Sequence, residues 1–351
     1  MKKGIIAGVI LLPIMIVLGY ELSSGRTPGI KDDSGNPIPE SIAALESVNL
    51  GGMQQWILIR GNDTSNPVLL WLHGGPGAAQ MPVARHFNGE LEQDFIVVHW
   101  DQRGAGKSNP RHFDEQTMTF DRFLDDAHEL TYLLKQRFNQ EKIYLVGHSW
   151  GSHLGILLVQ AYPEDYHAYV GLSQLVDPLA GHQVSYAWLS DEIERAGNQK
   201  DMDRLTQLGP PPFTVHSNYV TFAGLVDKYG GSMDISMLEL AWIALQAPEY
   251  RLGDYLAWLN GSTRGSGPMW EHTLSFNMFR DVPHLDLPVY FFSGRNDYNT
   301  PLELVEEYYQ ALDAPLGKQL IVFEESAHTP NMGEAEKFYR ELVRVKEETY
   351  P

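Results

Sequence analysis

At residues 143–152 the chain reads IYLVGHSWGS, in which an apolar strand pattern gives way to a helical pattern that continues to Tyr162. Ser149 stands at the corner between the two patterns. Gly147 and Gly151 lie two residues before and two residues after it, and a strand-to-helix turn this sharp leaves no room for side chains at those positions. The stretch therefore predicts a nucleophile elbow, in which a serine hydroxyl is presented at the end of a strand.

A serine hydroxyl is a poor nucleophile at neutral pH, so it needs a histidine base and an acid that orients the histidine. In α/β-hydrolases the acid and then the histidine follow the serine in the chain, on loops after the last strands. One late strand-like run is followed by Asp297 and the next by His328, which predicts Asp297 as the acid and His328 as the base. Glu324 and Glu325 compete with Asp297, but they share a segment with His328 and would need a reversal of the chain to meet its ring.

The apolar run at residues 68–72 leads directly into HGGPG at residues 73–77. Glycines let the backbone come close to a substrate carbonyl, and the proline stiffens the loop. An oxyanion hole in this arrangement takes one N–H group from the residue after the nucleophile and one from such a loop. We therefore predict that the backbone N–H groups of Gly75 and Trp150 form the oxyanion hole.

Three stretches together resemble the signatures of a known family: HGGPG at 73–77, DQRGAGKS at 101–108 and GHSWGS at 147–152. They are similar to those of the prolyl aminopeptidase (proline iminopeptidase) family of α/β-hydrolases, and the resemblance runs from about Ser41 to the end, except in a middle insertion. It implies release of an N-terminal residue, usually proline, from small peptides through an acyl-enzyme, with no metal or other cofactor. His148 departs from the family, which commonly has glycine there, and histidine is typical of the wider esterase-like superfamily.

Strand-like and helix-like segments alternate after a polar linker, which predicts an α/β fold with a mostly parallel central sheet. We expect a signal or anchor segment at 1–22, a linker at 23–40, the two parts of an α/β-hydrolase core at 41–176 and 284–351, and an inserted helical lid at 177–283. The helix before the elbow should face the sheet with Phe123, Ala127, Leu130 and Leu134. The expected strands are Ala43–Leu50, Gln54–Arg60, Val68–Leu72, Phe95–Trp100, Ile143–Val146, Ala168–Leu172, Val289–Phe292 and Leu320–Phe323.

The predicted lid contains three helix-like, aromatic-rich segments, Tyr186–Ala196, Met237–Ala247 and Tyr250–Leu259. A lid excludes water and shapes the pocket, so it should hold the determinants of substrate choice. In the resembled family, acidic residues of this insertion bind the free amino group of the substrate.

Glu239 and Glu271, which lie beside tryptophans, are the candidates for that amine site, whereas Glu249 is expected to face solvent, as are Glu192 and Glu194. Outside the lid, Arg103 has two open interpretations. It either meets a substrate carboxylate or forms a charge pair that holds its loop together.

Composition excludes several classes of function. The formal net charge of −19 argues against nucleic acid as a partner, because a phosphate backbone needs a surface rich in lysine and arginine. The absence of cysteine excludes disulfides, thiolate metal ligands and a cysteine nucleophile.

The N-terminus has the pattern of an export signal or membrane anchor, with Lys2 and Lys3 before an uncharged apolar run at residues 4–20. Seventeen residues of helix span roughly 25 Å, slightly less than a hydrocarbon core of about 30 Å. No Ala-x-Ala cleavage site follows, which favours a retained anchor. The catalytic domain is then expected outside the cytoplasm, or secreted if the segment is removed.

The sequence thus predicts a serine hydrolase that releases N-terminal residues of the proline type from small peptides. Two alternatives stay open: a membrane-associated carboxylesterase or lipase with the same triad, and a non-enzymatic sensor on the same fold, against which the intact catalytic set counts. Ser149 excludes epoxide hydrolase or dehalogenase chemistry, which needs aspartate at the elbow. The oligomeric state is not predicted.

Overall fold

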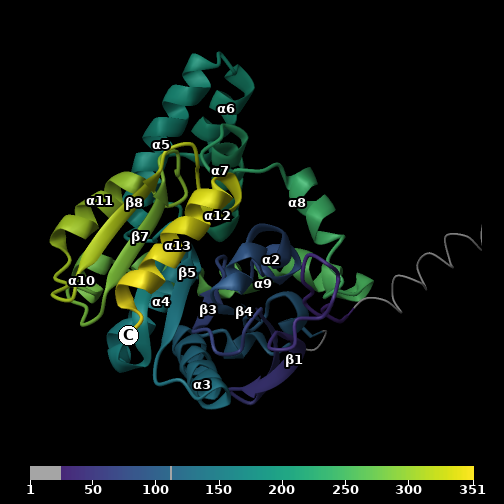
Figure 1. The fold of residues 1–351 in the computed structure, drawn as a ribbon. Helices are drawn as coiled ribbons and strands as arrows, with labels where there is room; N and C mark the ends of the chain where they lie inside the picture. Colours follow the sequence, from purple (N-terminus) through teal and green to yellow (C-terminus); the bar gives the residue numbers. More distant parts are fainter. Residues whose placement is uncertain (1–24, 111–112) are drawn as a thin grey trace, which may run out of the picture.

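A computed structural model describes residues 25–110 and 113–351 of the chain. The described residues form one eight-stranded sheet in the order β1-β2-β4-β3-β5-β6-β7-β8 (Figure 1). β2 is antiparallel to both of its neighbours, and all other neighbouring pairs are parallel. The strands are β1 (Ile42–Leu50), β2 (Met53–Gly61), β3 (Val68–Leu72), β4 (Ile96–Asp101), β5 (Ile143–His148), β6 (Tyr166–Leu172), β7 (Val289–Gly294) and β8 (Lys318–Phe323).

Each strand expected from the sequence corresponds to one of these strands, and the predicted fold class is confirmed. Successive side chains of β3 belong to opposite faces of the sheet, as the period of a strand requires. Leu70 and Leu72 join the core on one face, and Leu69 and Trp71 join the core on the other. The first face is covered by α3 (Phe120–Phe138), α4 (Trp150–Ala161) and α11 (Leu302–Ala311), and the second by α13 (Ala335–Thr349) (Figure 1).

Helix α3 faces the sheet with the predicted apolar stripe, because Phe123, Ala127, Leu130 and Leu134 are all fully buried. At its start the Thr119 side chain accepts a hydrogen bond from a backbone N–H of the first turn. The chain then enters β5 and the elbow, so α3 helps to fix the position of the strand that carries Ser149.

The chain between β6 and β7 is helical, as expected of a lid. It forms α5 (Pro178–Arg195), α6 (Gln199–Leu208), α7 (His216–Lys228), α8 (Met237–Ala244), α9 (Leu252–Ser275) and α10 (Met278–Asp281). Helices α5, α6 and α7 stand together above the sheet, and α8 lies apart from them at the edge of the molecule (Figure 1).

Helix α9 is much longer than the predicted helix, which ended at Leu259 where glycines and a proline begin. The reason is tertiary. A Cβ on Gly261 would lie 2.4 Å from the carbonyl oxygen of Gly77, and a Cβ on Gly265 would lie 2.4 Å from that of Pro76. The glycines therefore let α9 pack directly on the backbone of the HGGPG loop.

The predicted signal or anchor at 1–22 lies outside the described residues, as do the first two residues of the predicted linker at 23–40. Within 25–110 and 113–351, no helix has the length and apolar character needed to cross a membrane.

Candidate active site

Ser149 occupies the tight corner between β5 and α4, with φ of 55° and ψ of −122°. Its N–H donates to the carbonyl of Leu172 on the neighbouring strand β6, at 3.0 Å. A Cβ on Gly147 would lie 2.5 Å from the carbonyl oxygen of Gly151, and one on Gly151 would lie 2.3 Å from that of Leu72. Neighbouring backbone therefore leaves no room for a side chain at either position, and both must be glycine.

Asp297 and His328 lie on the loops after β7 and β8, and the structure brings them together. The Nδ1 atom of His328 is 2.8 Å from Oδ2 of Asp297, and both side chains are buried. Because Asp297 accepts at Nδ1, the Nε2 atom of a neutral His328 ring is left free to accept a proton.

The Asp297 carboxylate is surrounded by donors. Its Oδ1 accepts the backbone N–H groups of Asn299 and Thr300, each at 2.9 Å, and its Oδ2 also accepts the Thr300 hydroxyl at 2.7 Å. Burial acts to raise the pKa of Asp297, but the charge and hydrogen bond of His328 and the donors of Thr300 outweigh it and hold that pKa below its ordinary value. Asp297 is therefore ionised at neutral pH.

His148, the departure from the resembled family, belongs to a chain of hydrogen bonds that ends at the backbone of His328. Trp71 Nε1 donates to Gln80 Oε1 at 2.6 Å, and Gln80 Nε2 donates to His148 Nδ1 at 2.9 Å. His148 Nε2 then donates to the His328 carbonyl at 2.9 Å, and the Ser173 hydroxyl donates to the same carbonyl at 3.0 Å. Burial lowers the pKa of His148 to about 3, so the ring is neutral. Its role is to position the backbone of His328 through the hydrogen bond to the carbonyl.

The lid also holds the His328 loop. Asp234, in the segment before α8, accepts the backbone N–H groups of Ala327 and Thr329 at 2.6 and 2.8 Å. The N–H of His328 itself donates to the carbonyl of Ser232 at 2.7 Å. Lid and core therefore share the positioning of His328.

The HGGPG loop passes close to the serine, since a Cβ on Gly74 would lie 2.8 Å from the Cβ of Ser149. His73 stiffens the loop by donating from Nδ1 to the Gly74 carbonyl at 2.9 Å, while its Nε2 accepts the N–H of Gln102 at 3.2 Å. Gly75 has a φ of 113°, which favours glycine, and lines a cavity with Ser149. Trp150 lines the same cavity and is the first residue of α4, so its N–H has no acceptor within the helix.

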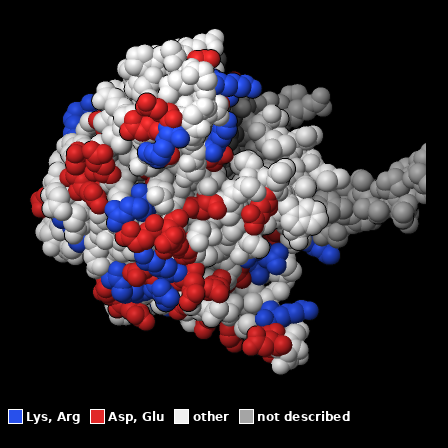
Figure 2. Space-filling model, turned by 90° about the horizontal axis from the view of Figure 1, so that it is seen from above, with Lys and Arg blue, Asp and Glu red and all other residues white. Residues whose placement is uncertain are grey.

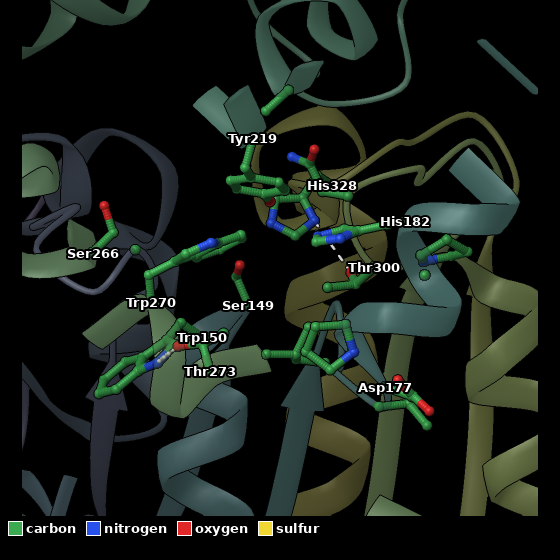
Figure 3. A pocket seen from close by; sticks show the side chains of 18 of the residues that line it. Ser149, Trp150, Asp177, His182, Tyr219, Ser266, Trp270, Thr273, Thr300 and His328 are labelled. Atoms are coloured by element: carbon green, nitrogen blue, oxygen red, sulfur yellow. Dashed lines mark hydrogen bonds between the residues drawn. The ribbon is translucent and has the colours of Figure 1, made fainter. Parts of the chain in front are cut away.

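Ser149 and His328 line two adjoining cavities. The first, here called the aromatic cavity, is walled by Tyr219, His182 and Trp270, and Figure 3 shows these rings around the Ser149 hydroxyl together with His328. No hydrogen bond joins the Ser149 hydroxyl to His328 among the described contacts, and such bonds are often long before substrate binds.

The second cavity is walled mainly by aliphatic and methionine side chains and is here called the aliphatic cavity. It extends from Ser149 toward α2 (Met81–Phe87), α8 and the start of α9. Its apolar lining is made by Ala78, Ala79, Val83, Ala223, Met233, Met237, Leu240, Trp258, Leu259 and Met332, and the ring of Tyr219 lines both cavities.

Comparison with known proteins agrees with this geometry. Residues 67–335 match the family described as alpha/beta hydrolase fold. The "Probable aminopeptidase YbaC" of Bacillus subtilis (strain 168) is 35% identical over 312 residues, which cover 88% of this chain and 98% of that protein. The chain belongs to the α/β-hydrolase fold family. The predicted resemblance is confirmed. The family match, together with the similarity to a protein named as an aminopeptidase, indicates an enzyme of the serine hydrolase type and not a non-enzymatic sensor.

Two further comparisons name proline iminopeptidases. The proline iminopeptidase of Heyndrickxia coagulans is 26% identical over 285 residues, covering 79% of this hydrolase and 89% of that protein. The solved structure of a proline iminopeptidase-related protein from Thermus thermophilus has a TM-score of 0.62 at 19% identity, covering 88% of this chain and 99% of that one. The structural likeness shows the common fold.

The two glutamates predicted for an amine site are not at either cavity of this hydrolase. Glu239 and Glu271 are exposed and line neither of them. One residue along a helix turns the side chain by about 100°, so Trp270 faces the aromatic cavity while Glu271 faces solvent. Likewise Leu240 lines the aliphatic cavity while Glu239 does not. Of the two neighbouring tryptophans, Trp270 lines the aromatic cavity, whereas Trp242 is exposed and lines neither cavity.

Glu249 was expected to face solvent, but this expectation is wrong, because its side chain is buried. Its Oε1 accepts the Thr27 hydroxyl at 2.9 Å and lies 3.5 Å from Nη1 of Arg85. Arg85 thus compensates the buried charge, and Glu249 attaches the start of the described chain to the turn between α8 and α9.

Two side chains of the aromatic cavity were missed by the sequence analysis. Asp177 is the one carboxylate among the described residues that line the two cavities; it caps α5, and its Oδ2 accepts Asn277 Nδ2 at 2.6 Å. His182 is buried, its Nδ1 has no hydrogen-bond partner among the described residues, and burial lowers its pKa to about 4. An aspartate before proline is a helix N-cap signal, but nothing in the sequence indicates that either residue lines this cavity. In Figure 3 the carboxylate of Asp177 points away from Ser149.

The structure supports the second interpretation of Arg103, in which the side chain forms a charge pair that holds its loop together. Its Nε and Nη2 donate to the two carboxylate oxygens of Asp126 on α3, at 2.9 and 3.1 Å, and both side chains are buried. Arg103 lines neither cavity, so it fixes the loop after β4 and does not face the substrate space.

Proposed function

We propose that this hydrolase cleaves an amide or ester bond through an acyl-enzyme, with Ser149 as nucleophile, His328 as base and Asp297 as the acid that orients the base. One observation carries the proposal. The buried hydrogen bond of 2.8 Å between Asp297 and His328 lies at the cavity into which the elbow presents Ser149.

In the first step His328 Nε2 takes the hydroxyl proton as Ser149 Oγ bonds to the substrate carbonyl carbon. The negative charge that develops on the carbonyl oxygen receives hydrogen bonds from the N–H groups of Gly75 and Trp150. The protonated His328 gives its proton to the leaving amine or alcohol as the carbon–nitrogen or carbon–oxygen bond breaks. Water repeats the sequence on the acyl-enzyme, releases the acid and restores the Ser149 hydroxyl.

For the substrate, we favour the release of an N-terminal residue of the proline type from a small peptide. The similarity to a protein named as an aminopeptidase, over 98% of its length, supports this choice. The rings of Tyr219 and Trp270 suit a compact apolar ring beside the reacting carbonyl. Asp177 lines the same cavity, and its carboxylate accepts hydrogen bonds from the first turn of α5 and from Asn277. Its negative charge, together with these π faces, would stabilise a substrate ammonium.

A carboxylesterase is the second candidate, and two observations favour it. Glu239 and Glu271 are absent from the cavities, and the aliphatic cavity beside Ser149 matches an acyl chain better than a charged amine. The two candidates use the same catalytic residues and differ in what the cavities recognise.

Three substrates separate the candidates: a prolyl arylamide, its N-acetylated form and a short-chain aryl ester. An aminopeptidase should turn over the free prolyl arylamide and lose most of that kcat/KM when the amine is acetylated. Turnover of the ester with no turnover of the free arylamide would overturn the aminopeptidase proposal and establish the esterase. The variant Asp177→Asn tests the amine partner, because it should raise KM for the free arylamide and leave KM for the ester unchanged.

A further inference from the structure

The lid carries an exposed apolar surface on α8, α9 and the turn between them. On the α8 side Leu238, Trp242 and Leu245 follow one another at spacings of four and three, and Leu238 is 86% exposed. The same spacing recurs on α9 in Leu252, Leu256 and Leu259. Together with Met237, these side chains are here called the α8–α9 face: Met237, Leu238, Trp242, Leu245, Leu252, Leu256 and Leu259.

This face is not a general property of the surface. Its seven members are half of the fourteen large apolar side chains that are exposed among the described residues, and they fall within residues 237–259. The two helices pack into the protein core through their other sides, where Leu240, Ile243 and Tyr255 are buried in one cluster. Tyr255 also donates to the Ala244 carbonyl at 2.6 Å, which joins α9 to α8. The exposed stripes are therefore additional to what packing needs.

Charge is sparse here although the whole chain has a formal net charge of −19. Residues 237–259 hold four charged side chains. Glu249 is buried and Asp254 is paired with Lys107 at 2.6 Å, while Glu239 and Arg251, one of each sign, are exposed. Figure 2 shows a mostly uncharged area toward its right side, between clusters of charged side chains. A patch with these properties fits an apolar partner.

The start of the described chain is held at this face. The N–H of Arg26 donates to the Pro248 carbonyl at 3.1 Å, and Thr27 donates to Glu249 at 2.9 Å, both in the turn between α8 and α9. The uncharged apolar run in the sequence ends at Tyr20. Five residue steps separate Tyr20 from Gly25, and an extended chain of that length reaches at most about 18 Å. The length of the chain therefore limits how far that run can be from the turn between α8 and α9.

We propose that the α8–α9 face docks on a lipid bilayer, to which the apolar run at residues 4–20 tethers the chain. The leucines and Trp242 lie at the boundary between headgroups and acyl chains, as in helices that lie in a membrane surface. Met237 and Leu259 belong to this face and also line the aliphatic cavity with Ser149. Docking therefore brings the entrance of that cavity to the lipid surface.

The chain has no cysteine, so single cysteines can be introduced and labelled with an environment-sensitive nitrobenzoxadiazole dye. The full chain is labelled in the variants Leu238→Cys and Leu256→Cys and reconstituted into vesicles of phosphatidylethanolamine and phosphatidylglycerol. Leu316→Cys is the matched control, because Leu316 is also exposed but lies before β8, away from the lid. Two quenchers are compared, aqueous iodide and a nitroxide carried on the lipid. Thermal melting verifies that each variant is folded.

We expect a blue shift, loss of iodide quenching and gain of nitroxide quenching at positions 238 and 256, and none of these at 316. Iodide quenching at 238 and 256 equal to that at 316 would overturn the proposal, as would failure of the chain to sediment with vesicles. Protection from both quenchers would also overturn it, because the face would then be covered by protein, either residues 4–20 of the same chain or a second copy.

Discussion

At the scale of single residues, Ser149 holds a backbone conformation that a residue with a side chain rarely adopts. Its φ of 55° is stabilised by surroundings: the hydrogen bond to Leu172 and the contacts that exclude side chains from Gly147 and Gly151. Strain of this kind is maintained only where the neighbouring structure leaves no alternative. Here its result is a hydroxyl presented to the cavities.

Replacing Ser149 by alanine should remove the nucleophile without disturbing the elbow, since alanine differs only by the hydroxyl. We expect loss of turnover on every substrate and loss of labelling by a fluorophosphonate probe, with an unchanged melting temperature. Residual labelling of the folded variant at the wild-type rate would show that a different residue is the nucleophile.

Replacing Asp297 by asparagine tests the orientation of His328. The amide would no longer accept from Nδ1 as a charged group and would hold the ring in the wrong tautomer, so kcat should fall by about 10⁴. The measurement is steady-state turnover of whichever substrate the wild type accepts. A fall of less than about tenfold would contradict the role of Asp297.

At the scale of elements, α9 connects lid and active site through its glycines. Gly261 and Gly265 lie against the backbone of the loop that carries Gly75. A helix with larger residues at these two positions would be held farther from that loop. The glycines lower the stability of the helix but allow α9 to lie directly against the loop.

The variant Gly265→Ala should lower activity, because its Cβ would lie 2.4 Å from the Pro76 carbonyl and would push α9 or the loop aside. Its matched control is Gly253→Ala in the first turn of the same helix, where a Cβ meets nothing within 4 Å. The control should keep activity and gain up to about 1 kcal/mol of stability. Equal kcat/KM values for the two variants would refute the close packing of α9 on the loop.

The Arg103–Asp126 pair joins the loop after β4 to α3, and removing one partner leaves a buried charge unpaired. Asp126→Ala should therefore reduce the free energy of unfolding by about 3–5 kcal/mol. The neighbouring Asp125 is exposed and lies 3.7 Å from Arg122, so Asp125→Ala should cost less than about 1 kcal/mol. Denaturant unfolding of both variants provides the comparison, and similar losses would contradict the structural role of Arg103.

At the scale of the whole molecule, core and lid also meet at a buried carboxylate. Asp101 at the end of β4 accepts the hydroxyl of Tyr250, which precedes α9, and the backbone N–H of Lys107 at 2.8 Å. Its Oδ1 is buried without a hydrogen-bond partner among the described residues. Burial raises the pKa of Asp101 to about 7, although the Tyr250 and Lys107 donors act to lower it.

A carboxyl group whose pKa is raised on folding stabilises the fold below its unfolded pKa and loses that contribution as pH rises through the folded pKa. For Asp101 the window runs from 3.8 to about 7. Between about pH 5 and about pH 8 the wild type should lose up to about 3 kcal/mol from this group. Asp101→Asn, which does not ionise, should show a smaller loss over the same range in denaturant unfolding. An identical pH dependence in the two proteins would show that Asp101 keeps an ordinary pKa.

The eight strands, the elbow and the candidates Ser149, Asp297 and His328 could all be read from the chain, because they depend on local patterns. Strand periodicity, glycine spacing and the order of the loops are properties of neighbouring residues. The 1–22 segment and the membrane location stay predictions, and the roles of the site residues await the variants described above.

What the sequence determined by itself was thus the order of the elements and the chemistry carried at the ends of β3, β5, β7 and β8. Tertiary structure alone decided which lid residues line the cavities beside Ser149. Asp177 and His182 reach the aromatic cavity while Glu239 and Glu271 do not, and the glycine-rich part of α9 is helical because of the loop beneath it. The physical reason is that tertiary packing decides which side of a helix faces the cavity. In the lid the packing contacts come from distant parts of the chain.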